Sequence, residues 1–344
     1  MRAAIYGAGA MGTVLGAYLA RAGRQIDLIT RNKSHVAALK EHGATIGGTV
    51  NFTVPVTALT PDEMTGEYDI IFLMTKQRDN ASICEFLRGY LKSDGAIITM
   101  QNGLPEHSVA DAIGMDRTLG CAVSWGATFK GDGCANLTSS PKKLTFSLGA
   151  YDTGNSNLGI AAELLGCMGK VTIEENFIGA RWAKLAINSA FSSISAVTGM
   201  TFGEVASSRK TKGIALSILN EAFSVAAAYG VKIEKIQAHD IVKIYGCNGG
   251  LKRLIALTFL PLAMKNHRDI ISGMYYDLVA GKKSDIDYIN GVVVRLAKKF
   301  GVAAPLNERL LSIAHKIENG EMSVSTGNIS LIQAYYPSND GKKD

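Results

Sequence analysis

The sequence predicts two domains of different class: an α/β domain with a doubly wound parallel sheet, followed by an all-α domain. At 344 residues the chain is long for one domain, so two are expected. Apolar runs of strand length alternate with helical patterns in the first half, whereas long helical periodicities take over after about Asn176. We therefore expect domains at residues 1–175 and 176–335, with a flexible tail at 336–344.

The expected elements of the first half alternate, with short loops between them. The run DIIFLMT is apolar on both faces, as a parallel strand covered on both sides requires. Repeated β-α-β units of this kind predict a doubly wound sheet. In order we expect strand AAIY, a helix from Ala10 to Ala22, strand QIDLIT, a helix that Ser34 caps and that ends at His42, a hairpin-like stretch around Gly47 and Gly48, strand DIIFLMT, a helix from Ser82 to Leu91, strands GAIITM, CAVSW and LTFSLGA, a helix from Leu158 to Met168 and strand VTIEE.

The second half is expected to be helical, with no Pro- or Gly-rich linker before it. Helical patterns cover residues 178–198, 214–229, 251–264, 284–300 and 306–319. Apolar faces of these helices could serve a homodimer interface or only the core, and the sequence leaves both open.

Composition excludes several classes of function. Hydrophobic residues make up 47% and charged residues 19%, which favours a packed core over disorder. The excess of cations, 36 − 30 = 6, is spread along the chain and suits an anionic small ligand rather than nucleic acid. Five cysteines without a CxxC pair indicate reduced cytoplasmic thiols and no metal site. The longest apolar stretch, LIALTFLPLAM, is 11 residues long, too short for a membrane helix.

The segment MRAAIYGAGAMG contains a G-x-G-x-x-G pattern, which is a weak signal alone. Here it follows a buried strand directly and precedes a helix. Gly7 then makes the tight turn, Gly9 lets the backbone approach a pyrophosphate at the helix N-terminus, and Gly12 allows close helix–strand packing. The segment predicts a dinucleotide-binding turn rather than a plain strand–helix connection. Its expected cofactor contacts are Gly7, Ala8, Gly9, Ala10, Met11 and Gly12.

The end of the second strand indicates which dinucleotide is bound. NAD-binding members of this fold usually carry an acidic residue there, to accept from the ribose 2′-OH. Here the strand ends in Thr30, Arg31, Asn32 and Lys33, and Asp27 comes three residues too early. Arg31 and Lys33 suit a 2′-phosphate, so the sequence predicts NADP(H). The alternative is that both are ordinary solvated loop charges.

Polar residues follow two later strands, in FLMTKQRD and ITMQNG. Lys76 and Asn102 lie where strand ends of a doubly wound sheet form a ligand crevice. Each signal is weak alone, because a lysine after a strand is commonly a surface residue and Asn-Gly is commonly a turn.

The helix ARWAKLAINSAFSSISAVTG carries Lys184 and Asn188 on one face, with Ser192 a further turn along. Its apolar surroundings make a lysine costly unless the amine has a partner or a task. A lysine that extends its amine to solvent is the alternative.

A third segment, GKKSDIDYINGVVVRLAKKFGVAAP, begins a helix. Ser284 is the expected N-cap, with Asp285 and Asp287 in the first turn, where the helix dipole favours carboxylates. Capping accounts for Asp287 without any function, whereas the role of Asp285 stays open.

Together, the GxGxxG start with Arg31, the TK and QNG segments, the WxKLxxN helix and S-D-I-D-Y-I-N-G resemble the ketopantoate reductase family, NADPH-dependent enzymes of pantothenate synthesis, over nearly the whole chain. The resemblance implies a Rossmann domain, a helical C-terminal domain and an active site in the cleft between them. It also implies that Lys184 is the general acid, that Asn188 and Asp285 bind substrate, and that Asn102 and Lys76 line the nicotinamide end. We further expect Ser192, Ser272 and Asn102 to contact the substrate.

Three positions depart from the family pattern, all on the substrate side. The family usually has Glu where this chain has Asp285, a second Asn where it has Ser192, and a carboxylate-binding Ser where it has Gly273, with Ser272 adjacent. We therefore expect NADPH-dependent reduction of ketopantoate or a close relative. The alternatives are another two-domain dehydrogenase, acting on a different 2-oxo or hydroxy acid or a sugar phosphate, and a non-catalytic NADP(H)-binding protein.

Overall fold

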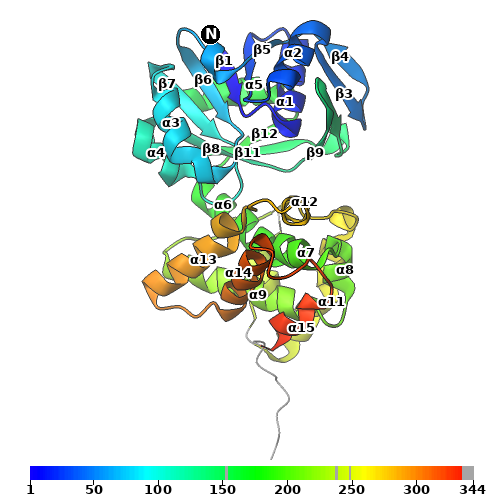
Figure 1. The fold of residues 1–344 in the computed structure, drawn as a ribbon. Coiled ribbons are helices and arrows are strands. Elements are labelled where there is room, and N and C mark those ends of the chain that lie inside the picture. Colours follow the sequence, from blue (N-terminus) through cyan, green and yellow to red (C-terminus); the bar gives the residue numbers. More distant parts are fainter. Residues whose placement is uncertain (152–153, 237–238, 248, 335–344) are drawn as a thin grey trace, which may run out of the picture. The chain divides into compact units, whose positions relative to one another are not determined.

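The computed structural model describes residues 1–151, 154–236, 239–247 and 249–334, and it divides into two compact units, Met1–Phe177 and Ile178–Asp344. Unit 1 is an α/β structure, and the elements of unit 2 within those ranges are helical (Figure 1). The predicted fold class, an α/β domain followed by an all-α domain, is confirmed. The expected tail at 336–344 lies outside the described residues.

Unit 1 is built on an eight-stranded sheet of order β12-β11-β8-β7-β6-β1-β2-β5. The six strands from β8 to β5 in this order run parallel, as predicted for all of them except β5, which was missed. β11 pairs antiparallel with β8 and parallel with β12. The strands are β1 (Ala3–Tyr6), β2 (Ile26–Ile29), β5 (Thr57–Leu59), β6 (Tyr68–Leu73), β7 (Leu91–Thr99), β8 (Thr118–Val123), β11 (Thr145–Ala150) and β12 (Lys170–Ile173).

Helices cover both faces of this sheet because alternate residues of each strand point to opposite sides. Ile5 and Phe72 belong to the core on one face, which includes α1 (Ala10–Arg21) and α5 (Asn157–Gly166). Ala4 and Ile71 belong to the core on the other face, which includes α3 (Asn80–Arg88) and α4 (Glu106–Ile113). Burial on both faces explains why the sequences of these strands are continuous apolar runs.

A second, smaller sheet of order β4-β3-β10-β9 was only half predicted. The expected hairpin is β3 (Ala44–Gly48) and β4 (Phe52–Val54), which pair antiparallel. Strands β9 (Ala127–Gly131) and β10 (Cys134–Leu137) were missed. β9 gives little apolar signal because most of its residues are exposed. Short 3-10 turns are η1 (Pro61–Glu63), η2 (Gln77–Asp79), η3 (Met115–Arg117) and η4 (Pro141–Lys143).

The second helix, α2 (Lys33–His42), begins earlier than expected, and Ser34 is not its N-cap. Asn32 occupies that position, and its Oδ1 accepts from the His35 N–H at 3.2 Å. The Ser34 hydroxyl donates to the same Asn32 oxygen at 2.8 Å. Either residue type suits a cap, so composition alone could not separate the two.

Unit 2 opens with a continuous helical segment made of α6 (Phe177–Ile187), the π-helical turn η5 (Asn188–Ser192) and α7 (Ser193–Thr198). Four longer helices were predicted within a few residues: α9 (Lys212–Ala228), α11 (Gly250–Ala263), α13 (Ile286–Phe300) and α14 (Pro305–Glu318). The shorter elements α8 (Phe202–Ser207), α10 (Ile241–Tyr245), η6 (Lys265–His267), α12 (Gly273–Val279) and α15 (Asn328–Gln333) were not predicted.

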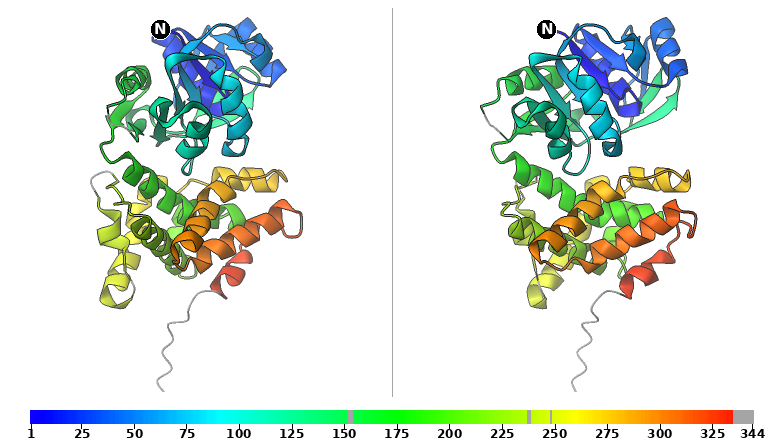
Figure 2. Two further views of the ribbon diagram at one scale, coloured as in Figure 1. Left: turned by 90° about the vertical axis from the view of Figure 1, so that its left-hand side faces the viewer. Right: turned by 60° about the vertical axis from the view of Figure 1, so that its left-hand side comes forward.

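Helices α13 and α14 lie side by side in unit 2, and both contact α9 (Figure 2). α13 buries Ile289, Val293 and Ala297 along one side, and α14 buries Leu310 and Ala314. Within the described ranges, no helix combines the length and apolarity that crossing a membrane requires.

Candidate functional site

The glycines of the first turn differ in what surrounds them. Gly7 has φ of 105°, and a Cβ there would lie 2.7 Å from the Met74 carbonyl carbon. A Cβ on Gly12 would lie 2.6 Å from the Gly7 carbonyl oxygen. Gly9 is exposed, and a Cβ there would meet nothing within 4 Å. The fold itself therefore demands glycine at the first and third positions, whereas the second leaves open space beside the backbone.

That open space lies at the N-terminus of α1. Gly9 is the N-cap residue, so no side chain caps the helix, and the first turn contains no acidic residue. Ala8 is buried, and Ala10 and Met11 are partly exposed. Unsatisfied N–H groups and the helix dipole make such a terminus favourable for a phosphate group. The residues present fit a dinucleotide pyrophosphate.

The end of β2 lies directly beside this turn. The Gly7 and Ala8 N–H groups both donate to the Ile29 carbonyl at 2.9 Å. Arg31 follows two residues later, is exposed, and lies close enough to Tyr6 for its charge to act on the Tyr6 hydroxyl. Burial raises the pKa of Tyr6, and the Arg31 charge opposes that rise. A guanidinium therefore occupies the position at which NAD-binding proteins of this fold usually carry an acidic residue, which accepts a hydrogen bond from the ribose 2′-OH.

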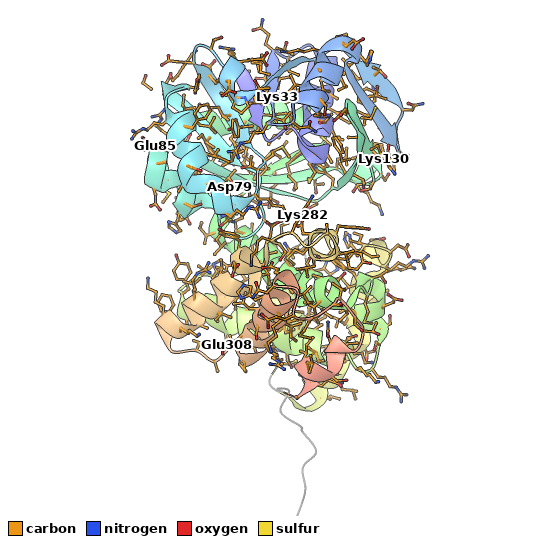
Figure 3. The ribbon with its side chains drawn as sticks, in the orientation of Figure 1. Lys33, Asp79, Glu85, Lys130, Lys282 and Glu308 are labelled. Carbon is orange, nitrogen blue, oxygen red and sulfur yellow. The ribbon has the colours of Figure 1, made fainter. Side chains whose placement is uncertain are left out.

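Two further charges near β2 have distinct surroundings. Lys33 is the first residue of α2 and is exposed (Figure 3). Asp27 accepts from the Arg2 guanidinium and from the Tyr68 hydroxyl, each at 2.8 Å. These bonds give Asp27 a structural role, in agreement with its exclusion as the ribose acceptor.

A buried histidine joins the cofactor turn to the second sheet. The Gly133 N–H donates to His35 Nδ1 at 2.9 Å, so Nε2 carries the hydrogen that faces Thr13 Oγ1 at 3.0 Å. The Thr13 hydroxyl in turn donates to the Ala8 carbonyl at 3.4 Å. Sequence reasoning missed this connection, because His35 and Gly133 are 98 residues apart.

The loops that carry Lys76 and Asn102 are tied together by side-chain amides. Gln101 Nε2 donates to the Thr75 carbonyl at 2.9 Å, and Gln77 Nε2 donates to the Asn102 carbonyl at 2.8 Å. Each loop thus holds the backbone of the other. The expectation that these two strand ends lie close together agrees with this geometry.

The same cluster contains a reciprocal amide pair. Asn80 and Gln101 exchange hydrogen bonds of 3.0 and 2.7 Å, and both side chains are buried. Thr99 donates to Gln101 and Asn80 to Ser108, at 2.9 and 2.8 Å. The sequence analysis assigned no role to these amides. A glutamine at the end of a buried strand could have indicated such a cluster, since a buried amide needs hydrogen-bond partners.

In unit 2, Lys184 lies on α6 and is partly buried, and Trp182 and Leu185 beside it are fully or almost fully buried. Asn188 and Ser192 begin and end the π-helical turn, and the Ser192 hydroxyl donates to Asn188 Oδ1 at 3.2 Å. Asn188 and Ser192, which were predicted one turn apart on this helix, therefore contact each other. The π-turn itself was not predicted, because one extra residue per turn leaves no compositional trace.

The start of α13 differs from the expected cap. Asp285, not Ser284, is the N-cap residue, and its carboxylate does not cap the helix. The Ser284 hydroxyl accepts from the Ile286 N–H at 3.3 Å and donates to Glu318 at 2.7 Å. Asp287 lies in the first turn, as predicted, and its Oδ1 is 2.9 Å from His315 Nε2. Capping therefore does not account for the Asp285 carboxylate.

Ser272 has a local role. It is 4% exposed, and its hydroxyl caps α12 by accepting from the Met274 N–H at 3.3 Å. Its own N–H donates to Ser195 Oγ at 3.0 Å. Gly273 beside it is exposed, and a Cβ there would meet nothing within 4 Å. A substrate contact from Ser272 stays a prediction.

Two family models match the chain. One, described as ketopantoate reductase PanE/ApbA, covers residues 3–151, and its C-terminal counterpart covers residues 176–318. The chain belongs to the ketopantoate reductase family. Membership makes it an oxidoreductase of a pyridine-nucleotide-dependent family.

Similar ketopantoate reductases come from distant organisms. The 2-dehydropantoate 2-reductase of Pyrococcus horikoshii is 26% identical over 322 residues, which is 93% of this chain and 98% of the relative. That of Archaeoglobus fulgidus is 25% identical over 320 residues, again 93% and 98%. Among solved structures, a PanE/ApbA family ketopantoate reductase from Ralstonia eutropha has a TM-score of 0.78 and 25% identity, with 93% of this chain and 99% of that chain covered.

A D-mandelate dehydrogenase structure shares the fold of the ketopantoate reductases. It has a TM-score of 0.79 with 22% identity, and it covers 93% of this chain and 99% of its own. That structure contains NADH and anilino(oxo)acetate.

Proposed function

We propose that this protein reduces a 2-oxo acid, 2-dehydropantoate or a close relative, to the 2-hydroxy acid with NADPH, and that Lys184 is the general acid. The observation that supports this most is that Lys184 lies one helical turn before Asn188, where a π-turn begins, in a chain matched by family models across both units. π-turns inside helices frequently occur at functional sites.

In this proposal, unit 1 holds the cofactor. Backbone N–H groups at Gly9 and the N-terminus of α1 bind the pyrophosphate, and Arg31 and Lys33 bind the 2′-phosphate. Lys76 and Asn102 line the nicotinamide end, on loops held by Gln77 and Gln101. When bound, the reduced nicotinamide supplies a hydride to the 2-oxo carbon.

Residues of unit 2 then act on the substrate. Lys184 Nζ donates a proton to the oxygen that gains negative charge as the carbonyl is reduced. Asn188 and Ser192 hydrogen-bond the substrate, and the Asp285 carboxylate accepts from its hydroxyl group. Ser272, whose hydroxyl also caps α12, is a further candidate for binding the substrate carboxylate.

The test is the oxidation of NADPH against a panel of 2-oxo acids that includes 2-dehydropantoate. We expect robust turnover of 2-dehydropantoate or a β-branched relative, and slower turnover with NADH. Negligible 2-dehydropantoate turnover beside fast reduction of another oxo acid would favour the second candidate below.

The second candidate is a dehydrogenase for a different 2-oxo or hydroxy acid, or a sugar phosphate. It is favoured by the open space at Gly273 and by Asp285, which is one methylene shorter than Glu. The D-mandelate dehydrogenase neighbour is a protein of the same fold whose structure contains an aromatic oxo acid analogue. A non-catalytic NADP(H)-binding protein is the third candidate, and it predicts tight NADPH binding with no turnover of any member of the panel.

We further propose a homodimer that uses the exposed face of α11. Leu251, Leu254 and Leu262 on this helix are 73%, 63% and 62% exposed, and Phe259 lies on it as well. Exposed apolar patches of this kind commonly mark association sites. A dimeric ketopantoate reductase from Staphylococcus aureus is among the structural neighbours, at a TM-score of 0.71. Sedimentation of the protein and of Leu254→Asp tests it: the variant should be monomeric.

A further inference from the structure

A cluster of buried polar side chains in unit 2 lies behind the proposed substrate residues. Asn290 and Asn307 are fully buried, on α13 and α14, and Glu221 of α9 is close to Asn307. Asn290 belongs to the S-D-I-D-Y-I-N-G segment, in which the sequence analysis assigned roles to Ser284, Asp285 and Asp287 but none to Asn290. Buried amides and carboxylates are costly unless they are fully hydrogen-bonded, so their partners define what they do.

The partners of Asn290 belong to the π-turn. Its Nδ2 donates to the Ser189 carbonyl at 3.0 Å, and its Oδ1 accepts from the Ser193 hydroxyl. Ser189 lies inside the turn Asn188–Ser192, and Ser193 follows it directly. One side chain from α13 thus binds a residue inside the irregular turn and the residue that follows the turn. The residues it joins are far apart in the chain: 101 positions for Ser189 and 97 for Ser193.

A second layer fixes the orientation of the Asn290 amide. Its Nδ2 also donates to Asn307 Oδ1 at 3.0 Å, and Asn307 Nδ2 donates to Glu221 Oε2 at 2.7 Å. Glu221 further accepts from the Leu306 and Asn307 N–H groups at 2.9 and 3.0 Å. Because a carbonyl only accepts, Ser189 requires the NH₂ side of Asn290 to face it. Every hydrogen bond in this series therefore has one consistent donor-to-acceptor direction.

We propose that Asn290 is a positioning residue: its side-chain amide holds the π-turn in the geometry that directs Asn188 and Ser192 to the substrate. This inference rests on the proposed function, since the substrate role of Asn188 belongs to it. A regular α-helical turn would rotate Asn188 relative to the residues after it, because a π-turn contains one more residue. Fixing the turn therefore fixes the direction of the side chain.

The hydrogen bonds between Asn290 and the turn also fix the positions of two proposed substrate-binding residues, Asn188 and Asp285, relative to each other. Asp285 is the N-cap residue of α13, five positions before Asn290 on the same helix. When Asn290 binds the turn, the start of α13 and the segment that carries Asn188 become one unit. Loss of the amide should therefore disturb both contacts while leaving the cofactor turn in unit 1 unchanged.

The test compares Asn290→Ala with Asn328→Ala. Asn328 is a matched control because it is also buried, and its Nδ2 donates to the Val197 carbonyl at 2.8 Å, in α7 beyond the π-turn. Both variants should lose stability. We expect only Asn290→Ala to lower kcat/KM for the oxo acid, on the order of 100-fold, with the Kd for NADPH unchanged. Ser193→Ala, which removes one donor and little volume, should give a smaller loss in the same direction.

Hydrogen exchange supplies a readout independent of activity. In Asn290→Ala, the amides of residues 189–194 should exchange faster, while those of α11 keep their rates. Equal losses of kcat/KM in the Asn290 and Asn328 variants, or unchanged exchange at 189–194, would overturn the inference. If the unmodified protein reduces no oxo acid, the proposed function fails, and the exchange result still reports whether Asn290 holds the turn. Should Asn290→Ala not fold, Ser193→Ala gives the same readouts.

Discussion

The cofactor turn of unit 1 and the π-turn of unit 2 are both departures from regular backbone, but they are produced in opposite ways. At the cofactor turn, glycines permit the geometry: Gly7 and Gly12 have no room for a Cβ. At the π-turn, side chains hold the geometry: Asn290 of α13 binds Ser189 inside the turn and Ser193 directly after it. The first is marked in the sequence by glycines within six residues, although Met74 supplies part of the crowding at Gly7, whereas the second depends on side chains from distant segments.

The largest expected effect removes the proposed acid. Lys184→Ala should lower kcat by about 10³-fold, within the usual range for loss of a general acid, with the NADPH Kd unchanged. The exposed lysine Lys316 on α14 provides a control, and Lys316→Ala should retain full activity. Steady-state kinetics and a fluorescence titration with NADPH measure both. An unchanged kcat in Lys184→Ala would show that the π-turn region does not supply the acid.

The next prediction contrasts two glycines of the cofactor turn. Gly7→Ala should destabilise unit 1 by roughly 2–4 kcal/mol, because a Cβ there contacts the Met74 backbone and φ is 105°. Gly9→Ala should leave stability almost unchanged, since nothing surrounds its Cβ, but should weaken NADPH binding. Thermal unfolding and binding titrations separate the two. If Gly9→Ala bound NADPH normally, the open space beside Gly9 would not be the pyrophosphate site.

Arg31 tests the choice of cofactor. Arg31→Ala should weaken NADPH at least tenfold, about 1.4 kcal/mol, and leave NADH binding unchanged, because only the 2′-phosphate contact is removed. Arg88→Ala is a suitable control, since Arg88 forms an exposed pair with Glu85 on α3. Equal affinities for NADH and NADPH in the unmodified protein would contradict the prediction at the outset.

The smallest effect concerns pH. Burial lowers the pKa of His35, with Asp132 opposing the shift, so the folded state binds fewer protons there than the unfolded state. The stability that His35 contributes is therefore complete above about pH 6.5 and is lost as the pH falls below it. His35→Asn should flatten the decline in Tm between about pH 7.5 and 5.5. If the Tm of His35→Asn fell as steeply with decreasing pH as that of the unmodified protein, the decline would be due to other titratable groups.

The same division between local and distant causes determines which parts of the structure could be predicted from the sequence. The parallel sheet, the glycine turn and the five long helical patterns were predictable because each depends on neighbouring residues. The hairpin of β9 and β10 was missed, because β9 is mostly exposed and is held by pairing with β10, which in turn pairs with β3. The cap of α2 was misplaced by two residues, since Asn32 and Ser34 are both suitable and share one hydrogen bond.

The candidate site shows the limit more sharply. Lys184, Asn188 and Asp285 could be singled out because they lie in the segments that resemble the ketopantoate reductase family. Gln101, Asn80 and Asn290 could not be assigned a role, since an asparagine or glutamine has no function until its partners are known. The capping expected of Ser284 was wrong in its position, because the helix begins one residue later than Ser284 implied.

The most direct test of the account is kcat/KM for 2-dehydropantoate with NADPH, measured for the unmodified protein and for Lys184→Ala. We expect turnover in the unmodified protein, preference for NADPH over NADH, and a loss of about 10³-fold in the variant. No turnover of 2-dehydropantoate or any related 2-oxo acid, in a protein that binds NADPH tightly, would contradict it.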